Sequence, residues 1–222
     1  MQKNAHELLE AGLNELQITW DHAAITKLET FIDELLLFNA RFDLVNSQSV
    51  DEIIVRHIFD SLAALPFFKQ AHCTKILDIG SGAGFPGIPL AIFLPEKKLT
   101  LAERSERRVN FLQNIQAVLR LHTVEIVQAD FKTLRTNYDT ITTRALTQIN
   151  AKLLNEMLRL LHDDGELILY KGTAEKTKAE MLLLDTEIQK HAAVVQIIPL
   201  QVPFLAHERC IVKIHKGVLP HE

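Results

Sequence analysis

Ile76-Leu77-Asp78-Ile79-Gly80-Ser81-Gly82-Ala83-Gly84-Phe85-Pro86-Gly87 is the stretch of sequence that decides the fold. It begins as an apolar run, continues as a turn with alternate glycines and ends in a proline and a glycine. This order predicts a buried strand at about 75–80, a glycine-rich turn and a helix at about 87–94. Because glycine has no side chain, the turn can bring backbone very close to a ligand.

Two classes of ligand fit a glycine-rich turn after a strand. Gly82, Gly84 and Gly87 match the spacing G-x-G-x-x-G, which would predict a nicotinamide dehydrogenase. In a nicotinamide site, however, the first glycine follows the strand directly and the third lies inside the helix. Here Gly80 comes first, and Asp78 precedes it at the strand end. A carboxylate there would repel a pyrophosphate but would attract an amine and a cationic centre, and S-adenosylmethionine carries both.

A second acid stands where the same ligand would need it. The next expected strand, at about 98–103, ends in Glu103. An acid at this place can accept hydrogen bonds from both ribose hydroxyls of an adenosine. Both NAD and S-adenosylmethionine contain that ribose, but Asp78 and Glu103 together favour the methyl donor. A nicotinamide dehydrogenase remains an alternative.

Strands and helices alternate along the rest of the chain. The remaining expected elements are strands at about 124–128, 138–143, 166–170, 192–198 and 208–215 and helices at about 105–119, 149–161 and 174–190. Alternation predicts a mostly parallel sheet with helices on both faces, and the two consecutive final strands predict an antiparallel hairpin. The expected fold class is α/β, a Rossmann-like class I S-adenosylmethionine-dependent methyltransferase with a mostly parallel seven-stranded sheet.

The N-terminal part of the chain reads as helical. Apolar residues recur at spacings of three and four along 28–42, and a second apolar stripe follows along 53–65. Each stripe needs a surface to bury against. We therefore expect an N-terminal helical extension at 1–70 that packs on a methyltransferase domain at 71–222.

Composition limits the class of protein. Hydrophobic residues make up 47% of the chain, enough for a sizeable core, and no apolar run has the length of a membrane span. The N-terminus lacks a signal-peptide pattern, and the two cysteines and ten histidines show no metal-ligand spacing. We expect a cytoplasmic protein with no metal and no membrane partner. The net charge of −4 lacks the basic balance typical of nucleic-acid binders, so an RNA role would depend on local patches.

The residues near the fourth strand restrict the chemistry. Methylation of a base carbon needs a nucleophile, normally cysteine, but Cys73 precedes the first strand and Cys210 lies in the last. Methylation of an exocyclic amine uses an Asn/Asp-Pro-Pro-aromatic turn, whereas residues 142–146 read Thr-Thr-Arg-Ala-Leu. An atom with a free lone pair, such as guanine N7, needs only alignment. Arg144 could provide it by contacting a guanine edge or by fixing the cofactor, and a structural ion pair is the other explanation for this residue.

Several segments together resemble a known family. They are Asn39, Val-Arg-His-Ile-Phe-Asp-Ser-Leu at 55–62, Asp-Ile-Gly-Ser-Gly-Ala-Gly-Phe-Pro-Gly-Ile-Pro-Leu at 78–90, Arg-Arg-Val-Asn-Phe-Leu at 107–112, Thr-Arg-Ala at 143–145, Lys-Gly at 171–172 and Glu-Arg at 208–209. Over nearly its full length the chain resembles the bacterial family once called glucose-inhibited division protein B. Members of that family methylate N7 of a guanine in 16S ribosomal RNA, so the resemblance implies this reaction. It also implies S-adenosylmethionine as cofactor and 16S ribosomal RNA, within the small ribosomal subunit, as partner.

The resemblance and the residue patterns together give the candidate sites. The predicted cofactor contacts are Asp78, Gly80, Gly82, Gly84, Phe85, Glu103, Asp130, Phe131, Lys132 and Arg144. The predicted RNA contacts are Arg56, His57, Arg104, Arg107, Arg108 and Lys171, and Arg144 is the candidate catalytic residue. Residues 130–132 depart from the Arg-x-Glu-Glu segment usual in the family, although Asp130 could still accept from the adenine amine while Phe131 packs on the ring. Two other classes stay open, a small-molecule methyltransferase and a non-catalytic binder of the cofactor.

Overall fold

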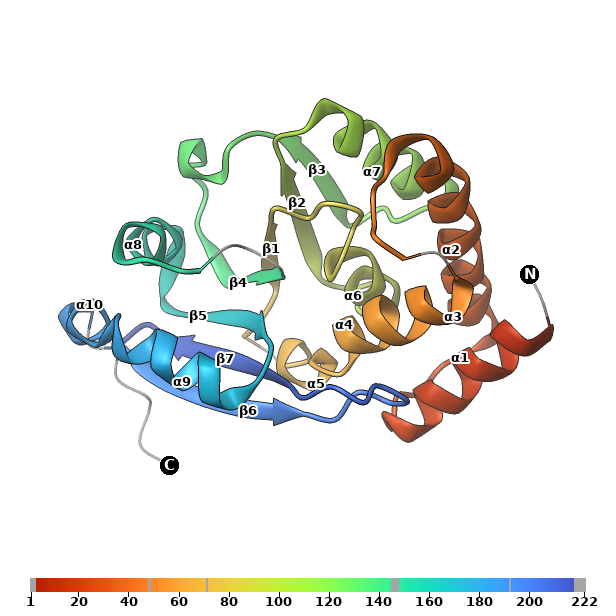
Figure 1. Ribbon diagram of the computed structural model, residues 1–222. Coiled ribbons are helices and arrows are strands. Elements are labelled where there is room, and N and C mark those ends of the chain that lie inside the picture. The colour runs from red at the N-terminus through yellow and green to blue at the C-terminus, as the bar shows by residue number, and fades with distance from the viewer. Residues whose placement is uncertain (1–2, 48, 71, 145–147, 192, 218–222) are drawn as a thin grey trace.

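A computed structural model of the chain describes residues 3–47, 49–70, 72–144, 148–191 and 193–217 (Figure 1). Seven strands form one sheet in the order β3-β2-β1-β4-β5-β7-β6. Their bounds are β1 Lys75–Ile79, β2 Lys98–Glu103, β3 Val124–Gln128, β4 Tyr138–Arg144, β5 Leu161–Lys171, β6 Val194–Leu200 and β7 Arg209–His215. The first five strands pair in parallel, while β7 runs antiparallel to β5 and β6. The expected sheet and its antiparallel final hairpin are confirmed.

Helices connect these strands and precede them. Their bounds are α1 Lys3–Glu15, α2 His22–Phe42, α3 Val50–Ile53, the π-helix η1 Ile54–Phe59, α4 Asp60–Leu62, α5 Leu65–Phe68, α6 Gly87–Phe93, α7 Glu106–Val118, the 3₁₀ helix η2 Phe131–Thr133, α8 Ala151–Arg159, α9 Ala174–Leu182 and α10 Asp185–Lys190. Ala145 of the Thr-Arg-Ala motif lies outside the described residues.

Two expected boundaries were wrong. The strand expected at 166–170 begins at Leu161, because Leu161 already pairs with Tyr138 before the register shifts to Glu166 opposite Thr140. The extra residues between these pairs form an irregularity within β5, so the Asp-Asp-Gly segment is not a turn that precedes the strand. The helix expected at 174–190 is two helices, α9 and α10, separated at residues 183 and 184.

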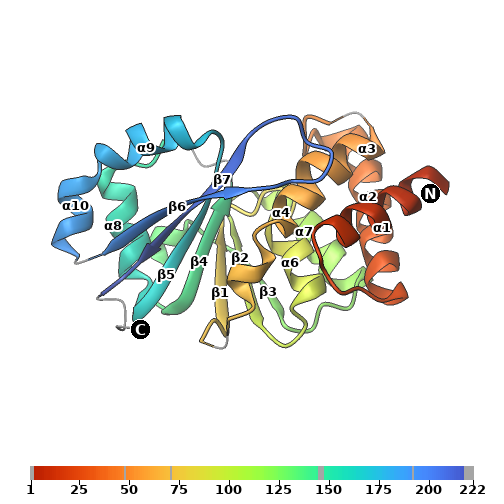
Figure 2. The same ribbon diagram turned by 90° about the horizontal axis from the view of Figure 1, so that it is seen from below.

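Alternate residues of the central strands point into two cores on opposite faces of the sheet. Ile76 and Leu99 face the core that contains α2, α6 and α7, whereas Leu77 and Ile79 face the core that contains α8, α9 and α10. Figure 2 shows these two groups of helices on either side of the strands. Parallel strands covered on both faces read as continuous apolar runs, which explains the sequence of β1.

The N-terminal helices share the core of α6 and α7. The stripe of α2 is fully buried at Leu28, Phe31 and Leu35. The ring centroid of Phe31 lies 5.2 Å from that of Phe85 in the glycine-rich turn and 6.5 Å from that of Phe111 in α7. The extension therefore supports the turn from outside, and its division from the rest of the chain at residue 70 stays a prediction.

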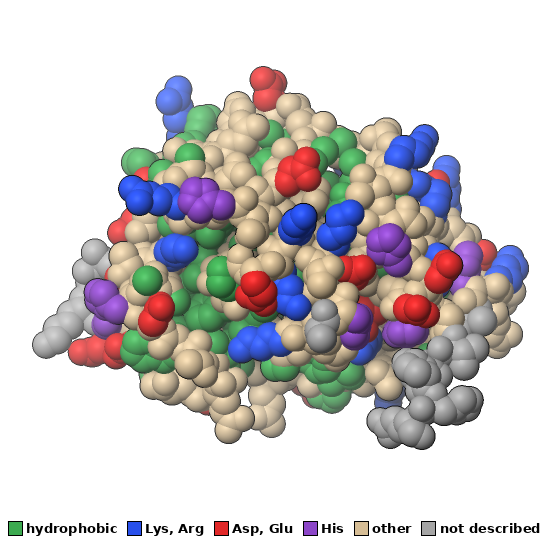
Figure 3. Space-filling model, turned by 180° about the vertical axis from the view of Figure 1, so that it is seen from behind, with side chains coloured by type: hydrophobic (Ala, Val, Ile, Leu, Met, Phe, Trp, Pro, Cys, Tyr) green, Lys and Arg blue, Asp and Glu red, His purple; other side chains and the backbone are tan. Residues whose placement is uncertain are grey.

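Figure 3 shows acidic and basic side chains interspersed over the face opposite to the view of Figure 1. Within the described ranges, no helix is both long and apolar enough to cross a bilayer. No three His, Cys, Asp or Glu side chains of those same ranges are grouped so that they could ligate a metal ion.

Replacing Gly84 by alanine is expected to destabilise the fold. Gly84 has a φ of 91°, and an added Cβ would lie 2.6 Å from Cγ1 of Ile88. The left-handed backbone and the overpacking together should lower the free energy of unfolding by about 2–4 kcal/mol. Urea denaturation measures this, with Gly172→Ala as the control, because a Cβ there meets nothing within 4 Å. Equal stability of the two variants would contradict the packing role of Gly84.

Candidate active site

A cleft of about 450 Å³ opens at the carboxyl ends of β1, β2, β3 and β4. From β1 the sheet extends to β2 and β3 on one side and to β4 on the other, so the strand order reverses here. Open parallel sheets bind ligands at such a switch point. The cleft is lined by Ile79, Gly80, Ala102, Glu103, Arg104, Arg108, Ala129, Asp130, Phe131, Lys132, Arg144, Gln148, Asn150, Lys152 and Leu153.

The glycine-rich turn brings backbone to the cleft at Gly80. This residue has a φ of 69°, and its N–H donates to the Ala102 carbonyl over 2.8 Å, which ties the turn to β2. A left-handed backbone favours glycine at this position. Gly80 therefore forms part of the cleft wall, whereas Gly84 lies under the turn against Ile88.

The Asp78 carboxylate lies beneath the turn and not in the cleft wall. It is 1% exposed, and its Oδ2 accepts from the Gly87 N–H over 3.1 Å at the first residue of α6. Its Oδ1 is buried without a hydrogen-bond partner among the described residues. Burial raises the pKa of Asp78 to about 7. In this structure the strand-end acid holds the start of α6 against β1.

The Glu103 carboxylate organises the other side of the cleft. Its Oε2 accepts from the Gly82 N–H over 3.0 Å, and its Oε1 accepts from the N–H groups of Arg104 and Ser105 over 2.8 and 2.9 Å. A carboxylate offers about four acceptor sites. Three are used, so Glu103 has capacity left for a ligand hydroxyl.

The segment after β3 closes the cleft. The Asp130 Oδ1 accepts from the Lys132 N–H over 3.1 Å, and Nη1 of Arg104 lies 3.8 Å from Asp130 Oδ2. Phe131 is buried in the core of α8 and also lines the cleft. The segment therefore offers a carboxylate and an aromatic ring at the place where the sequence predicted adenine contacts.

A second pocket of about 680 Å³ lies next to the cleft. It is lined by Arg56, His57, Asp60, Arg144, Tyr170, Lys171, Gly172, Thr173, Lys176, Leu205, His207, Glu208 and Arg209. Among the described residues only Arg144 lines both spaces. Its guanidinium therefore stands at the boundary between the cleft and the second pocket.

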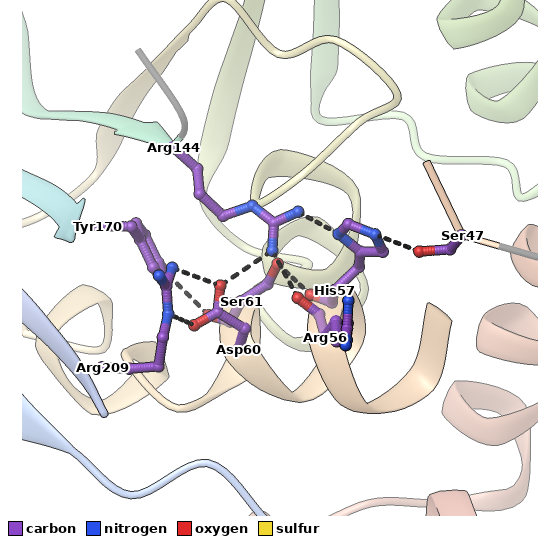
Figure 4. A network of polar contacts seen from close by, with 8 residues as sticks. All are labelled: Ser47, Arg56, His57, Asp60, Ser61, Arg144, Tyr170 and Arg209. Atoms are coloured by element: carbon purple, nitrogen blue, oxygen red, sulfur yellow. Dashed lines mark hydrogen bonds and ion pairs between the residues drawn. The ribbon is translucent and has the colours of Figure 1, made fainter. Parts of the chain in front are cut away.

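A network of polar contacts holds the Arg144 guanidinium in place (Figure 4). Its Nη1 donates to Asp60 Oδ2 over 3.0 Å and to the Arg56 carbonyl over 3.1 Å, and its Nη2 donates to Nδ1 of His57. The guanidinium carbon lies 5.1 Å from the centroid of the Phe85 ring. Burial lowers the pKa of Arg144, and the Asp60 charge opposes that shift. Arg144 thus forms the structural ion pair that the sequence left open, with Asp60 as its partner. It also lines both the cleft and the second pocket.

His57 is neutral in this network. Its Nδ1 accepts from Arg144, so the proton of the neutral ring is on Nε2, which donates to Ser47 Oγ over 3.0 Å. The ring stacks on Phe85 with centroids 4.9 Å apart. Burial and the neighbouring arginines lower the pKa of His57 to about 3. His57 is therefore a half-buried side chain with hydrogen bonds on both ring nitrogens, and its contact with RNA stays a prediction.

The structure brings most predicted site residues to these two spaces. The predicted cofactor residues in the cleft wall are Gly80, Glu103, Asp130, Phe131, Lys132 and Arg144, and those outside the wall are Asp78, Gly82, Gly84 and Phe85. The predicted RNA residues in either wall are Arg56, His57, Lys171, Arg104 and Arg108, whereas Arg107 packs over Phe42. Their ligand contacts stay predictions.

Sequence reasoning gave no role to four members of the network, which are Ser47, Ser61, Tyr170 and Arg209. Arg209 binds Asp60, Ser47 accepts from His57, and the Tyr170 hydroxyl donates to the Ser61 carbonyl over 2.7 Å. Ser61 and Arg209 lay within segments that resembled the family, whereas Ser47 and Tyr170 did not. Residues far apart in sequence show such pairing only once the fold is known.

The neutral state of His57 should make the fold sensitive to acid. Its pKa falls from 6.5 to about 3 on folding, so its contribution to stability is present above pH 6.5 and is lost as pH falls. His57→Asn keeps an acceptor for Arg144 but cannot titrate. Between pH 6.5 and about pH 5 we expect the variant to lose up to about 2 kcal/mol less unfolding free energy than the wild type. Urea titrations at several pH values across this range measure how steeply the free energy of unfolding falls with pH.

His122→Asn is the control, because His122 is an exposed histidine outside both spaces. It should keep the pH dependence of the wild type. If the unfolding free energy of His57→Asn depends on pH as steeply as that of the wild type, His57 does not stay neutral in the folded protein.

Comparison with solved structures supports the fold at low sequence identity. A precorrin-6y C5,15-methyltransferase from Geobacter metallireducens is 14% identical, with a TM-score of 0.55 over 80% of this chain and 92% of that one. TYW2 from M. jannaschii, solved in complex with AdoMet, is 14% identical, with a TM-score of 0.54 over 72% of this chain and 77% of that one. These likenesses show a class I methyltransferase fold.

Comparison of sequences shows the family. The chain is 39% identical to a ribosomal RNA small subunit methyltransferase G from Treponema pallidum, over 95% of this chain and 94% of the relative. It is 36% identical to a protein of the same name from Treponema denticola, over 94% and 92% of the two chains. The family model described as GidB, rRNA small subunit methyltransferase G, matches residues 24–211. The cleft, the second pocket and the Arg144 network lie within that match, and the chain belongs to the GidB family.

Proposed function

We propose that the protein transfers a methyl group from S-adenosylmethionine to N7 of a guanine in the 16S ribosomal RNA of the small ribosomal subunit. The structural observation that carries this proposal is the pair of spaces that meet at Arg144. The cleft suits a methyl donor, and the second pocket suits a nucleobase. Membership of the GidB family supports ribosomal RNA as the substrate class.

The cleft residues fit S-adenosylmethionine. Gly80 presents bare backbone at the end of β1, and Glu103 is 6% exposed with acceptor capacity left for a ribose hydroxyl. Asp130 and Phe131 offer a carboxylate and a ring for the adenine. The Asp78 carboxyl below the turn is partly ionised near neutral pH, since burial raises its pKa to about 7, and that negative charge favours a cationic ligand.

The acceptor atom is one that needs no activation. The Cys73 thiol lies before β1, and burial raises its pKa to about 11, so it is not a thiolate nucleophile. The Cys210 thiol is buried within β7. When bound, S-adenosylmethionine supplies an electrophilic methyl group, which the N7 lone pair takes as the bond from methyl carbon to sulfur breaks. The protein residues have to align the two partners and exclude water.

The position of Arg144 limits how it can assist. A bidentate contact with guanine O6 and N7 would occupy the lone pair that reacts. Three of the five guanidinium N–H groups donate within the network, so the Nε–H and one N–H of Nη2 have no hydrogen-bond partner among the described residues. We assign one of these two N–H groups to guanine O6, which orients the base and leaves N7 free.

The second pocket suits a base that is presented by an RNA strand. Arg56 and Lys176 give its wall positive charge, and the single Asp60 carboxylate faces two cations, Arg144 and Arg209. Glu208 is an exposed acid of the same wall, and Lys171 is neutralised over 2.7 Å by Glu180. With a net charge of −4, the protein as a whole would not hold naked RNA by charge alone. We therefore infer that the substrate is a shaped particle, the small ribosomal subunit, met in the cytoplasm.

Glu103→Gln should weaken cofactor binding. The amide keeps one acceptor oxygen but turns an N–H₂ group toward the amides that the carboxylate now binds. Because hydrogen bonds to a charged group contribute about 1.5–3 kcal/mol, the Kd for S-adenosylmethionine should rise by about 10- to 100-fold. Isothermal titration calorimetry measures it, after a melting curve has shown that the variant is folded.

Glu106→Gln is the matched control for this experiment. Glu106 is an exposed acid in the first turn of α7 and lines neither space. It should bind S-adenosylmethionine as the wild type does. Equal affinity of both variants would remove Glu103 from the cofactor site.

The reaction itself is tested by transfer of labelled methyl from S-adenosylmethionine. Intact small ribosomal subunits, stripped ribosomal RNA and a metabolite extract are offered in parallel. We expect label in the RNA of intact subunits, with strand cleavage at one guanine after reduction and aniline treatment, which reports N7 methylation. More label in stripped RNA than in subunits would contradict the particle as substrate.

Two other results would replace the proposal. Label only in metabolites would favour a small-molecule methyltransferase. No transfer despite measured binding of S-adenosylmethionine would favour a non-catalytic binder.

A further inference from the structure

Asp60 is a buried acid that joins two arginines from different strands. It is the first residue of α4 and is 3% exposed. Its partners are Arg144 at the end of β4 and Arg209 at the start of β7. Removing a carboxylate from water costs free energy that a close cation offsets, and here two cations pair with it.

The geometry of the Asp60 contacts is directional. Arg209 binds side-on, with Nε donating to Oδ1 over 2.7 Å and Nη2 donating to Oδ2 over 2.8 Å. This bidentate pair fixes the plane of the carboxylate. The same Oδ2 then accepts from Arg144 Nη1 over 3.0 Å. The direction of the Arg144 guanidinium therefore depends on a carboxylate that Arg209 holds.

The other contacts of Arg144 are neutral. They are the Arg56 carbonyl, the neutral His57 ring and the face of Phe85. Asp60 is the acid within ion-pair distance of Arg144 in the described part of the chain. It thus supplies both the charge that keeps a buried guanidinium in place and the oxygen that directs it.

Asp60 can be changed without removing the anchor of its helix. The neighbouring Ser61 carbonyl accepts from the Tyr170 hydroxyl over 2.7 Å, and Ser61 Oγ donates to the His57 carbonyl over 2.6 Å. These bonds fasten α4 to β5 and η1 independently of the Asp60 carboxylate. An asparagine at this position is therefore expected to leave the helix where it is.

We propose that Asp60 is a positioning residue for methyl transfer: held by Arg209, it directs Arg144 at the boundary between the donor cleft and the acceptor pocket. This inference rests on the proposed function. Its consequence is that Asp60, which lines the acceptor pocket and lies outside the wall of the donor cleft, affects the reaction through Arg144.

A double-mutant cycle tests this consequence. The variants are Asp60→Asn, Arg144→Ala and both together, and the readouts are kcat and KM for methyl transfer into small ribosomal subunits and the Kd for S-adenosylmethionine. We expect Asp60→Asn to lower kcat by about 10- to 100-fold, because misdirection of an aligning group acts on the reaction step. The Kd for S-adenosylmethionine should change less than about threefold, which is below 1 kcal/mol.

The cycle separates positioning from a structural role. If Asp60 acts through Arg144, the double variant is no slower than Arg144→Ala alone. Asp139→Asn is the control, because Asp139 accepts from the Thr74 hydroxyl and the Lys75 N–H away from both spaces. Any loss from Asp139→Asn should multiply with that from Arg144→Ala.

Two outcomes would overturn the inference. One is an Asp60→Asn variant with the kcat of the wild type, and the other is a loss that multiplies with that of Arg144→Ala. If Asp60→Asn does not fold, Arg209→Lys replaces it in the cycle, because lysine cannot bind the carboxylate bidentately. A wild-type protein that transfers no methyl group to subunits would refute the proposed function, a result distinct from failure of the cycle.

Discussion

The hydrogen bond from the Gly87 N–H to the buried Asp78 carboxylate is the contact on which the rest of the site depends. It joins the end of β1 to the start of α6 and forces the chain between them into a tight turn. Gly80 can then expose its backbone to the cleft, because the turn is tied to β2 at the same time. A side chain at residue 87 would not fit, since its Cβ would lie 2.7 Å from Asp78 Oδ2. The sequence of this segment is therefore set by packing under the turn as much as by the ligand above it.

The turn also determines where Phe85 lies, and Phe85 connects the turn to the N-terminal helices. One contact of its ring is with Phe31 of α2, and others are with His57 and the Arg144 guanidinium. Aromatic rings pack in such tilted and stacked arrangements at favourable energy. The N-terminal segment is thus part of the site, because it supplies both the support for the turn and the residues that hold Arg144. Any movement of the N-terminal helices away from the turn would have to break these contacts together.

Sequence patterns predicted the sheet because burial on both faces leaves a strong signal, and they placed Glu103 and Arg144 because strand ends are easy to locate. Sequence patterns could not tell which glycine of the turn faces the ligand cleft and which one packs inside the protein. Gly80 faces the cleft and Gly84 packs on Ile88, yet both stand in the same alternating run. Nor could they find the partner of Asp60, because Arg209 lies 149 residues away and meets it only through the order of β5 and β7 in the sheet. Local chemistry is readable from sequence, whereas pairing across the fold depends on topology.

Charge placement reconciles an acidic protein with an RNA substrate. The sulfonium donor carries a positive charge before transfer and the N7-methylated guanine carries it afterwards, so a site made only of arginines would disfavour both states. The structure places carboxylates below and beside the arginines, with Asp78 under the turn and Asp60 against Arg144. Buried charges act over short distances with little screening, while exposed ones are screened by salt within about 10 Å. Exposed basic groups can therefore meet phosphates at the rim while buried acids balance the cations inside. The net charge of the chain therefore describes neither the rim nor the interior of the site. Whether a charged side chain is buried or exposed decides whether it acts on the reacting groups or on phosphates.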